Sequence, residues 1–256
     1  MARTKRMTMV TPKLRKGEVL VLRTSAADGT SYGGFKWPDS VGAVVEAPDW
    51  DPTPRCGHGL HGLLWGEGDG SLLQWGSGSR WQVVAVKATD VVAIDSDKVK
   101  FPRGRLLYSG SDRVAATALV LAHAPAGTVC VGASVGAGDG GTATAGYRGT
   151  ATAGHDGKAS AGDYGKASAG NEGTASAGHC GKASAGDRGT ATAGYGGRAS
   201  AGYGGRVRAG ELGLLRLLYW DNSSNRYREV TAYVGENGIK ANTWYQLNSK
   251  HRFCRG

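Results

Sequence analysis

An eight-residue unit repeats nine times between Gly141 and Leu212 without an insertion or a deletion. Gly fills its first and sixth positions, and Ala almost always fills its third and fifth, as in GTATAGYR and GKASAGDY. Positions two and four hold Thr, Ser, Lys or Arg, and positions seven and eight vary. Alternation over four residues is typical of a β-strand. A strict period of this kind predicts a repeat architecture.

The glycines bracket each short strand, where a turn needs either a positive φ or a close approach of two backbones. Two octads then form one 16-residue coil with two strands that face each other. Because the inward residues are Ala, the two sheets must lie close together, and ladder hydrogen bonds between coils must supply much of the stability. We therefore expect a thin, flattened β-solenoid. A flexible Gly/Ser linker would not keep its register over nine units.

Larger apolar residues at both ends of the repeat indicate transitions into capping structure, which protects the terminal strands of a solenoid. The octad pattern predicts inward side chains at Val129, Val135 and Ala137 before the clear units. After them it predicts the same for Val207, Leu215 and Leu217. The segment 219–256 alternates and turns like a small β-meander that would cap the solenoid.

The segment 17–124 has the composition of an ordinary small domain. We expect strands within GEVLVLRT, AVVEAP, GLHGLLWG, SLLQWG and WQVVAVKATDVVAID, and a helix over 111–124 with Ser111 as N-cap and Pro125 beyond its end. The fold class predicted for the whole chain is mainly β. It comprises a basic flexible arm (1–16), an α+β domain (17–124), the solenoid (125–218) and the meander cap (219–256).

The chain carries a formal net charge of +10, which favours acidic partners. Residues 1–16 hold six basic side chains and no acidic one, so this arm is the best candidate to bind nucleic acid or another polyanion. Four cysteines are widely spaced without a CxxC pair, which is typical of a reducing cytoplasm rather than of a disulfide-stapled secreted domain. The sequence contains no stretch of about 18 apolar residues, so it predicts no membrane span.

The units AGYRGTATAG and AGYGGRASAGYGG resemble the repeats of bacterial ice-nucleation proteins. The resemblance implies a similar flat solenoid and a tyrosine edge through which two molecules could form a homodimer. Tyr147, Tyr195 and Tyr203 fill the tyrosine position. The whole arrangement is also similar to uncharacterised bacterial and phage proteins in which a domain with a CGHGLHG stretch precedes Ala/Gly/Ser repeats, so a phage or mobile-element association is a further expectation.

The outward positions of the solenoid are the main candidate binding surface. Thr-Ala-Thr units there suit an ice-binding role, but long basic side chains interrupt them. Basic and acidic residues are too mixed between 141 and 212 to predict a nucleic-acid stripe. The sequence therefore favours a non-catalytic spacer and protein-interaction surface, with ice binding as the alternative. The candidate binding residues are Thr142, Thr144, Thr150, Thr152, Lys158, Lys166, Lys182, Thr190, Thr192, Arg198 and Arg206.

The N-terminal domain offers a second candidate site. The stretch RCGHGLHG places Cys56, His58 and His61 within six residues, which leaves open a metal site, a Cys–His nucleophile or simply a packed histidine at a strand end. Arg23, followed by the stretch Ser31–Gly34, is similar to the arrangement in ADP-ribosyltransferases, but no glutamate matches the catalytic one of that family. We expect no cofactor, no metal and no catalysis.

Overall fold

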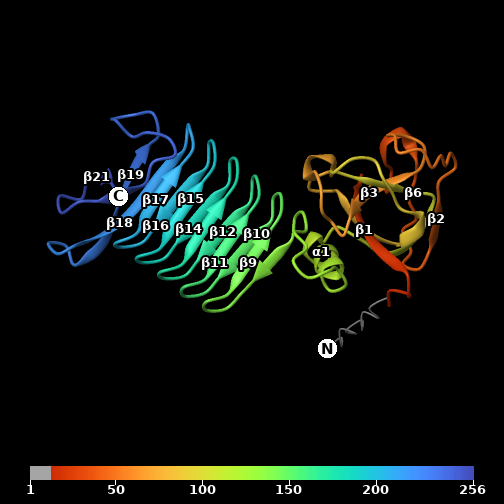
Figure 1. The fold of residues 1–256 in the computed structure, drawn as a ribbon, viewed down its shortest axis with the longest axis horizontal. Coiled ribbons are helices and arrows are strands. Elements are labelled where there is room, and N and C mark those ends of the chain that lie inside the picture. Colours follow the sequence, from red (N-terminus) through yellow and green to blue (C-terminus); the bar gives the residue numbers. More distant parts are fainter. Residues whose placement is uncertain (1–12) are drawn as a thin grey trace, which may run out of the picture.

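The computed structural model describes residues 13–256, so most of the predicted basic arm lies outside the described residues. Figure 1 shows an N-terminal sheet domain, an elongated solenoid that leads away from it, and a capping structure at the far end. The predicted fold class is confirmed.

The N-terminal domain is built on one seven-stranded antiparallel sheet with the order β2-β7-β4-β1-β3-β6-β5. The middle of β1 and of β4 is a continuous run of buried residues, and the sequence predicted strands at β1 to β5, but β6 and β7 were not predicted. Strand β7, next to the edge strand β2, pairs with β4 across a register shift between Val83 and Val84. The strands are β1 (Glu18–Ser25), β2 (Val44–Glu46), β3 (Leu60–Leu64), β4 (Arg80–Lys87), β5 (Val92–Ala93), β6 (Val99–Phe101) and β7 (Arg103–Gly110).

Two local predictions for this domain are wrong. The segment SLLQWG contains no strand but the 3-10 turn η2 (Gly70–Leu72), because the Asp69 carboxylate accepts hydrogen bonds from the Ser71 backbone N–H and hydroxyl. The helix is α1 (Arg113–Leu121), and Asp112 caps it rather than Ser111. The Asp112 carboxylate accepts from the N–H groups of Val114 and Ala115, which satisfies two free donors of the first turn.

The solenoid consists of about five turns of 16 residues, in two parallel sheets. Strands that lie 16 residues apart pair in register, so Lys158 faces Thr142 and Ala159 faces Ala143. One sheet holds β8 (Ser134–Gly136), β10 (Thr150–Ala153), β12 (Lys166–Ala169), β14 (Lys182–Ala185), β16 (Arg198–Ala201) and β18 (Leu214–Asp221). The other holds β9 (Thr142–Ala145), β11 (Lys158–Ala161), β13 (Thr174–Ala177), β15 (Thr190–Ala193) and β17 (Arg206–Ala209).

Close backbone approach, rather than a positive φ, explains the repeated glycines. A Cβ added at Gly173 would lie 2.8 Å from the Ala169 Cβ and 2.9 Å from the Gly157 carbonyl oxygen. The left-handed residue of each octad is instead the eighth, including non-glycine residues such as Tyr164 (φ 55°) and Leu212 (φ 55°). The turn therefore uses position eight, while the glycines let successive coils stack closely.

Alanine methyl groups fill the interior, and larger residues close it at the C-terminal end. Val207, Leu215 and Leu217 are buried as predicted. The hairpin of β18 with β19 (Arg226–Tyr233) and the pair β20 (Tyr245–Leu247) and β21 (Phe253–Arg255) extend the two sheets antiparallel to the coils. These antiparallel strands cover the edges that the last coil would otherwise expose.

The N-terminal end of the solenoid shares its core with the first domain. Val135 and Ala137 pack inward as predicted, but Val129 is 37% exposed, because its N–H bonds to the Glu67 carboxylate before the first coil begins. The Tyr147 ring packs against Trp75 with centroids 5.6 Å apart. The two parts therefore meet through packed side chains rather than through a loose linker.

Candidate functional site

The strand alternation gives the solenoid two outer faces of different chemistry. We call the outward side of β10, β12, β14 and β16 the lysine face, and that of β9, β11, β13, β15 and β17 the threonine face. On the lysine face, Lys166 pairs in register with Lys182, and Lys182 with Arg198. All three side chains are exposed, and none forms an ion pair within the described residues.

The predicted threonine positions divide between the two faces. Thr142, Thr144, Thr190 and Thr192 lie on the threonine face. Thr150 and Thr152 lie on the lysine face. Lys158 interrupts the threonine row between the first pair and Thr174. Neither face therefore carries an unbroken threonine row.

Arg206 closes the threonine face at its C-terminal end, where the cap contacts it. Its guanidinium carbon lies 5.6 Å from the centre of the Trp244 ring, and that of Arg208 lies 4.6 Å from the same ring. This cation–π contact occupies the arginines of the threonine face. The three cations of the lysine face have no such partner within the described residues.

The tyrosines do not form a single row. Tyr147 and Tyr195 lie on one edge of the solenoid, and Tyr203 lies on the opposite edge, because adjacent octads turn at opposite corners. Tyr164 and His179 fill the gap between the first two, with successive ring centroids 5.6, 5.7 and 5.2 Å apart. Tyr164 stands at position eight rather than seven, which is why the repeat alignment did not include it.

Polar residues at position seven stabilise the stacking instead. The Asp163 carboxylate accepts from the His179 N–H of the next coil at 2.8 Å, and Asp187 accepts from the Tyr203 N–H at the same distance. Asn171 accepts from the Asp187 N–H at 3.0 Å. The Asp and Asn side chains at this position are therefore acceptors of hydrogen bonds between coils, whereas His179 contributes only its backbone N–H.

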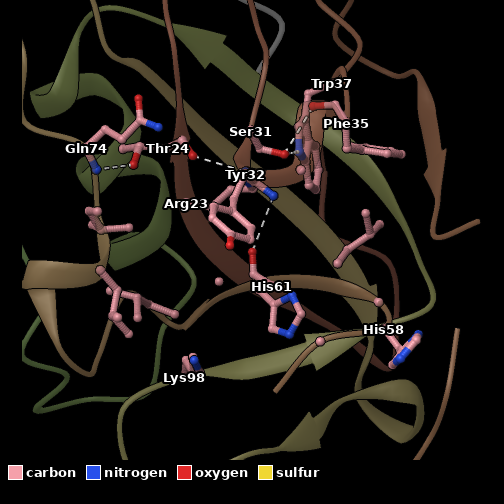
Figure 2. Close-up of a pocket in the computed structure, with 18 of the residues that line it drawn as sticks. Arg23, Thr24, Ser31, Tyr32, Phe35, Trp37, His58, His61, Gln74 and Lys98 are labelled. Atoms are coloured by element: carbon pink, nitrogen blue, oxygen red, sulfur yellow. Dashed lines mark hydrogen bonds between the residues drawn. The ribbon is translucent and has the colours of Figure 1, made fainter. Parts of the chain in front are cut away.

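The N-terminal domain contains a cleft of about 650 Å³, shown in Figure 2. Strands β1 and β3 supply Arg23 and His61, and the loop before β3 supplies His58. These three of the four predicted residues are brought together. The remaining wall includes Ser31, Tyr32, Phe35, Trp37, Asp49, Leu63, Leu72, Leu73, Gln74 and Lys98.

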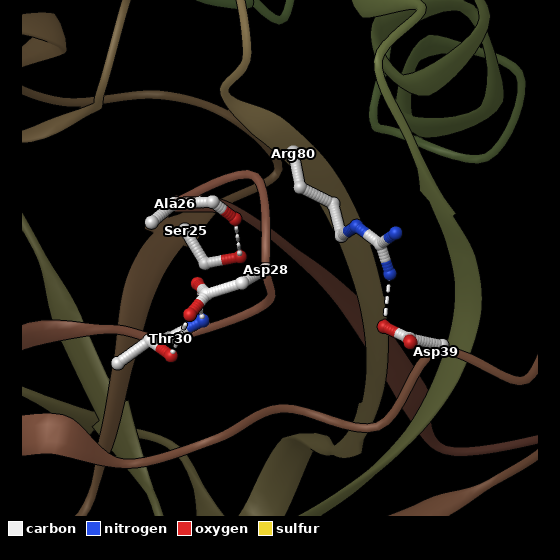
Figure 3. Close-up of polar contacts among 6 residues, drawn as sticks. All are labelled: Ser25, Ala26, Asp28, Thr30, Asp39 and Arg80. Atoms are coloured by element: carbon white, nitrogen blue, oxygen red, sulfur yellow. Dashed lines mark hydrogen bonds and ion pairs between the residues drawn. The ribbon is translucent and has the colours of Figure 1, made fainter.

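Local polar contacts hold the loop that forms one side of the cleft (Figure 3). The Asp28 carboxylate accepts from the Thr30 N–H at 2.9 Å and from its hydroxyl at 2.8 Å. Arg80 of β4 forms an ion pair with Asp39 at the other end of the loop. The loop thereby places Tyr32, whose side chain is fully exposed, at the cleft.

Arg23 is the most buried charge in the cleft, at 9% exposed. Its guanidinium carbon lies 3.7 Å from the centre of the Trp37 ring. Two of its nitrogens donate to the carbonyl oxygens of Thr24 (3.1 Å) and His61 (3.5 Å). Burial lowers the pKa of Arg23 to about 9, so the side chain stays charged at neutral pH.

Cys56 does not line the cleft. Its Sγ accepts from the Lys98 Nζ at 3.1 Å, and Lys98 is itself part of the wall. His58 Nδ1 lies 3.5 Å from an Asp49 carboxylate oxygen. Within residues 13–256 no group of three or more His, Cys, Asp or Glu side chains is arranged to hold a metal ion, so the CxHxxH spacing does not produce a ligand cluster.

Burial, followed by the charges of Lys98, Lys100 and Arg23, lowers the pKa of His61. The ring is therefore neutral at pH 7, and its Nε2 is buried without a hydrogen-bond partner. Lys100 is only 1% exposed, and its Nζ donates to the Gly57 carbonyl oxygen at 3.4 Å. Trp37, Lys98 and Lys100 are absent from the sequence prediction because only the alternation along β6 and the loop geometry bring them here.

No helix in the described part of the chain is long and apolar enough to span a membrane.

The comparisons support the solenoid resemblance. The chain is 33% identical over 126 residues to the ice nucleation protein InaU of Pantoea ananas, which covers 49% of this chain and 12% of that protein. It is 36% identical over 107 residues to an ice nucleation protein of Pseudomonas syringae, covering 41% and 9%. The similarity is thus distant, and the chain spans about a tenth of the length of these relatives. No family model and no solved structure matches the chain.

Proposed function

We propose that this protein is a non-catalytic binding and structural protein, in which the solenoid is a rigid spacer and a protein-interaction surface. The observation that carries the proposal is the row of Lys166, Lys182 and Arg198 on the lysine face. Neighbouring strands lie about 4.8 Å apart, so these cations repel one another across the ladder. Such a row stabilises nothing within the fold and suits an acidic surface on a protein partner.

The spacer role rests on how the two ends of the solenoid are held. Tyr147 packs on Trp75 at one end, and Tyr245 is buried against the last coil at the other. The repeat spans roughly 22 Å at about 4.8 Å per stacked strand. A partner bound on the lysine face would then sit at a defined distance from the cleft of the first domain.

To identify the partner, the full chain is cross-linked through Lys166 and Lys182 of the lysine face, and the cross-linked protein is identified by mass spectrometry. Its affinity is then measured for the variant Lys166→Ser/Lys182→Ser/Arg198→Ser and for a matched control, Lys158→Ser/Thr174→Ser, on the threonine face. We expect the first variant to lose binding about tenfold or more and the control to keep it. Equal affinity of both would refute the lysine face as the interface, and cross-links between two copies would identify a homodimer instead.

Ice binding through the threonine face is the second candidate. Thr142, Thr144, Thr190 and Thr192 share that face, and the relatives named above are ice nucleation proteins. The test is thermal hysteresis near freezing, measured for the full chain and for Thr142→Lys/Thr190→Lys. Hysteresis that the double substitution abolishes supports this candidate, and its absence in the unchanged protein eliminates it.

The proposal includes a role for the basic arm and a location in the cell. A polyanion bound by residues 1–16 should lose affinity in a chain that begins at Gly17, as measured by salt-dependent gel shifts. Unchanged binding would refute a role for the arm. A cytoplasmic location is consistent with the four cysteines, all of which are free.

A further inference from the structure

We propose that the cleft of the N-terminal domain binds a small organic molecule that carries an oxyanion, a phosphate or a carboxylate, and that Arg23 is the residue that binds this group. This inference concerns a different part of the molecule from the solenoid surface. It does not depend on the partner proposed for that surface.

The carrying observation is a buried cation without a counter-ion. Arg23 forms no ion pair within residues 13–256. Only two of its five N–H groups have acceptors, and both of these are backbone carbonyl oxygens. Its Nε is buried and has no partner. A charge removed from water in this way costs several kcal/mol unless another charge compensates it.

Trp37 offsets part of that cost and also orients the guanidinium. The ring covers one face of the planar group at 3.7 Å, so an anion would have to reach the guanidinium through its N–H edge rather than through that face. Figure 2 shows the Arg23 side chain in the cleft with its two hydrogen bonds to the carbonyl oxygens of Thr24 and His61. A planar edge with free N–H groups matches the two oxygens of a phosphate or a carboxylate.

The rest of the cleft has the same electrostatic character. Lys98 adds a second cation to the wall. The buried Lys100 lies behind the loop that carries Gly57. Asp49 is the single acidic residue of the wall within the described chain, and it lies beside His58. Positive charge in a walled cleft raises the local concentration of anions.

The size and the apolar part of the wall indicate an organic molecule rather than a bare ion. A volume of about 650 Å³ lies within the range of small-molecule sites, roughly 300–1,000 Å³. Leu63, Leu72 and Leu73 supply apolar surface, and Tyr32 supplies an exposed ring. Gly33 (φ 75°) and Gly34 (φ 81°) follow Tyr32 and allow the sharp turn that places the ring there.

The test uses three aromatic probes that differ in one group: phenyl phosphate, benzoate and benzyl alcohol. Each is titrated into the full-length protein by calorimetry, at two salt concentrations. We expect one or both anions to bind saturably, more weakly at high salt, and benzyl alcohol to bind at least tenfold more weakly. The comparison of phenyl phosphate with benzoate identifies the oxyanion. Failure of both anions to bind better than the alcohol would overturn the proposal.

Substitutions then assign the role to Arg23. Arg23→Gln should weaken anion binding about tenfold or more, whereas the matched control Arg103→Gln, on the exposed end of β7, should leave it unchanged. Arg23→Met provides a second readout. Because the arginine is buried without a counter-ion, the ligand-free Met variant should have a melting temperature equal to or above that of the unchanged protein. If Arg23→Met melts at a lower temperature than the unchanged protein and Arg23→Gln binds the anions with unchanged affinity, Arg23 is a structural residue and the proposal is refuted.

Discussion

Substitution of a stacking glycine by alanine should disrupt the solenoid far more than the size of one methyl group suggests. In Gly173→Ala the new Cβ would lie 2.8 Å from the Ala169 Cβ and 2.9 Å from the Gly157 carbonyl oxygen. Carbon atoms prefer separations of about 3.5–4.0 Å, so both the preceding strand end at Ala169 and the neighbouring coil at Gly157 must shift by about 0.5 Å. The same carbonyl oxygen accepts the Thr174 N–H at 2.9 Å, and that ladder bond would lengthen beyond the usual range.

The expected cost combines overpacking with one or two weakened ladder bonds. Overpacking costs about 1–3 kcal/mol, and each hydrogen bond contributes about 0.5–1.5 kcal/mol. Loss of conformational freedom in the unfolded chain returns about 0.4–1 kcal/mol. With a mid-range value for each contribution, the free energy of unfolding should fall by about 2–3 kcal/mol, measured by urea denaturation followed by circular dichroism.

Gly204→Ala is the matched control. Gly204 stands at position eight with φ 70°, and the nearest atom to an added Cβ is the Arg188 Cγ at 3.6 Å, an ordinary contact. The left-handed conformation costs an alanine about 1–2 kcal/mol, and the unfolded-state gain reduces the net loss to about 1 kcal/mol or less. Equal losses for the two substitutions would refute the argument that close coil stacking requires glycine at position one.

Three further predictions concern other parts of the chain. Leu212→Gly, at an exposed left-handed residue, should raise the free energy of unfolding in urea by about 0.5–1 kcal/mol, and a decrease would contradict strain there. Leu217→Ala, at a residue buried beneath the cap, should lower the free energy of unfolding by about 2–5 kcal/mol. An unchanged free energy of unfolding would show that the cap does not pack on this residue. Burial raises the pKa of Cys130 to about 12, so iodoacetamide at pH 8 should modify the exposed Cys180 and not Cys130, as read by mass spectrometry. Since the unfolded thiol ionises near pH 8.5, stability should decline above that pH in the unchanged protein and less so in Cys130→Ala.

The coil could be predicted from the sequence of the octad because the physical constraints on its shape are local. Alternation determines which residues point inward, and the uniform Ala at those positions determines how closely the sheets approach. The predictions failed where a local polar contact competed with the apolar pattern. Asp69 turns the chain at Gly70, and Asp112 replaces Ser111 as the helix cap. Both are short side chains that accept from backbone N–H groups two residues ahead.

The cleft was only partly predictable for a different reason. Arg23, His58 and His61 were selected as residue types, but nothing in their spacing indicates that β1 and β3 are paired neighbours. Trp37 and Lys98 lie on loops whose position depends on contacts such as Arg80 with Asp39. The missing counter-ion of Arg23 is a property of the assembled structure, because any of the acidic residues of the domain could have been its partner.

The charge of the solenoid shows why composition alone underestimates its surface. Averaged over the repeat, eight basic and five acidic residues leave a net charge of only +3, which argues against a binding stripe. The coil, however, contains two octads, so residues from alternate octads lie on the same face. Lys166, Lys182 and Arg198 stand in alternate octads and meet in one row, whereas Lys158 lies on the other side. The acidic side chains stand mostly at positions seven and eight, at the edges, where Asp163 and Asp187 accept ladder hydrogen bonds. Because successive octads lie on opposite faces, uncompensated positive charge gathers on the lysine face. An interaction through that face should depend on the spacing of 16 residues between the cations rather than on the net charge of the chain.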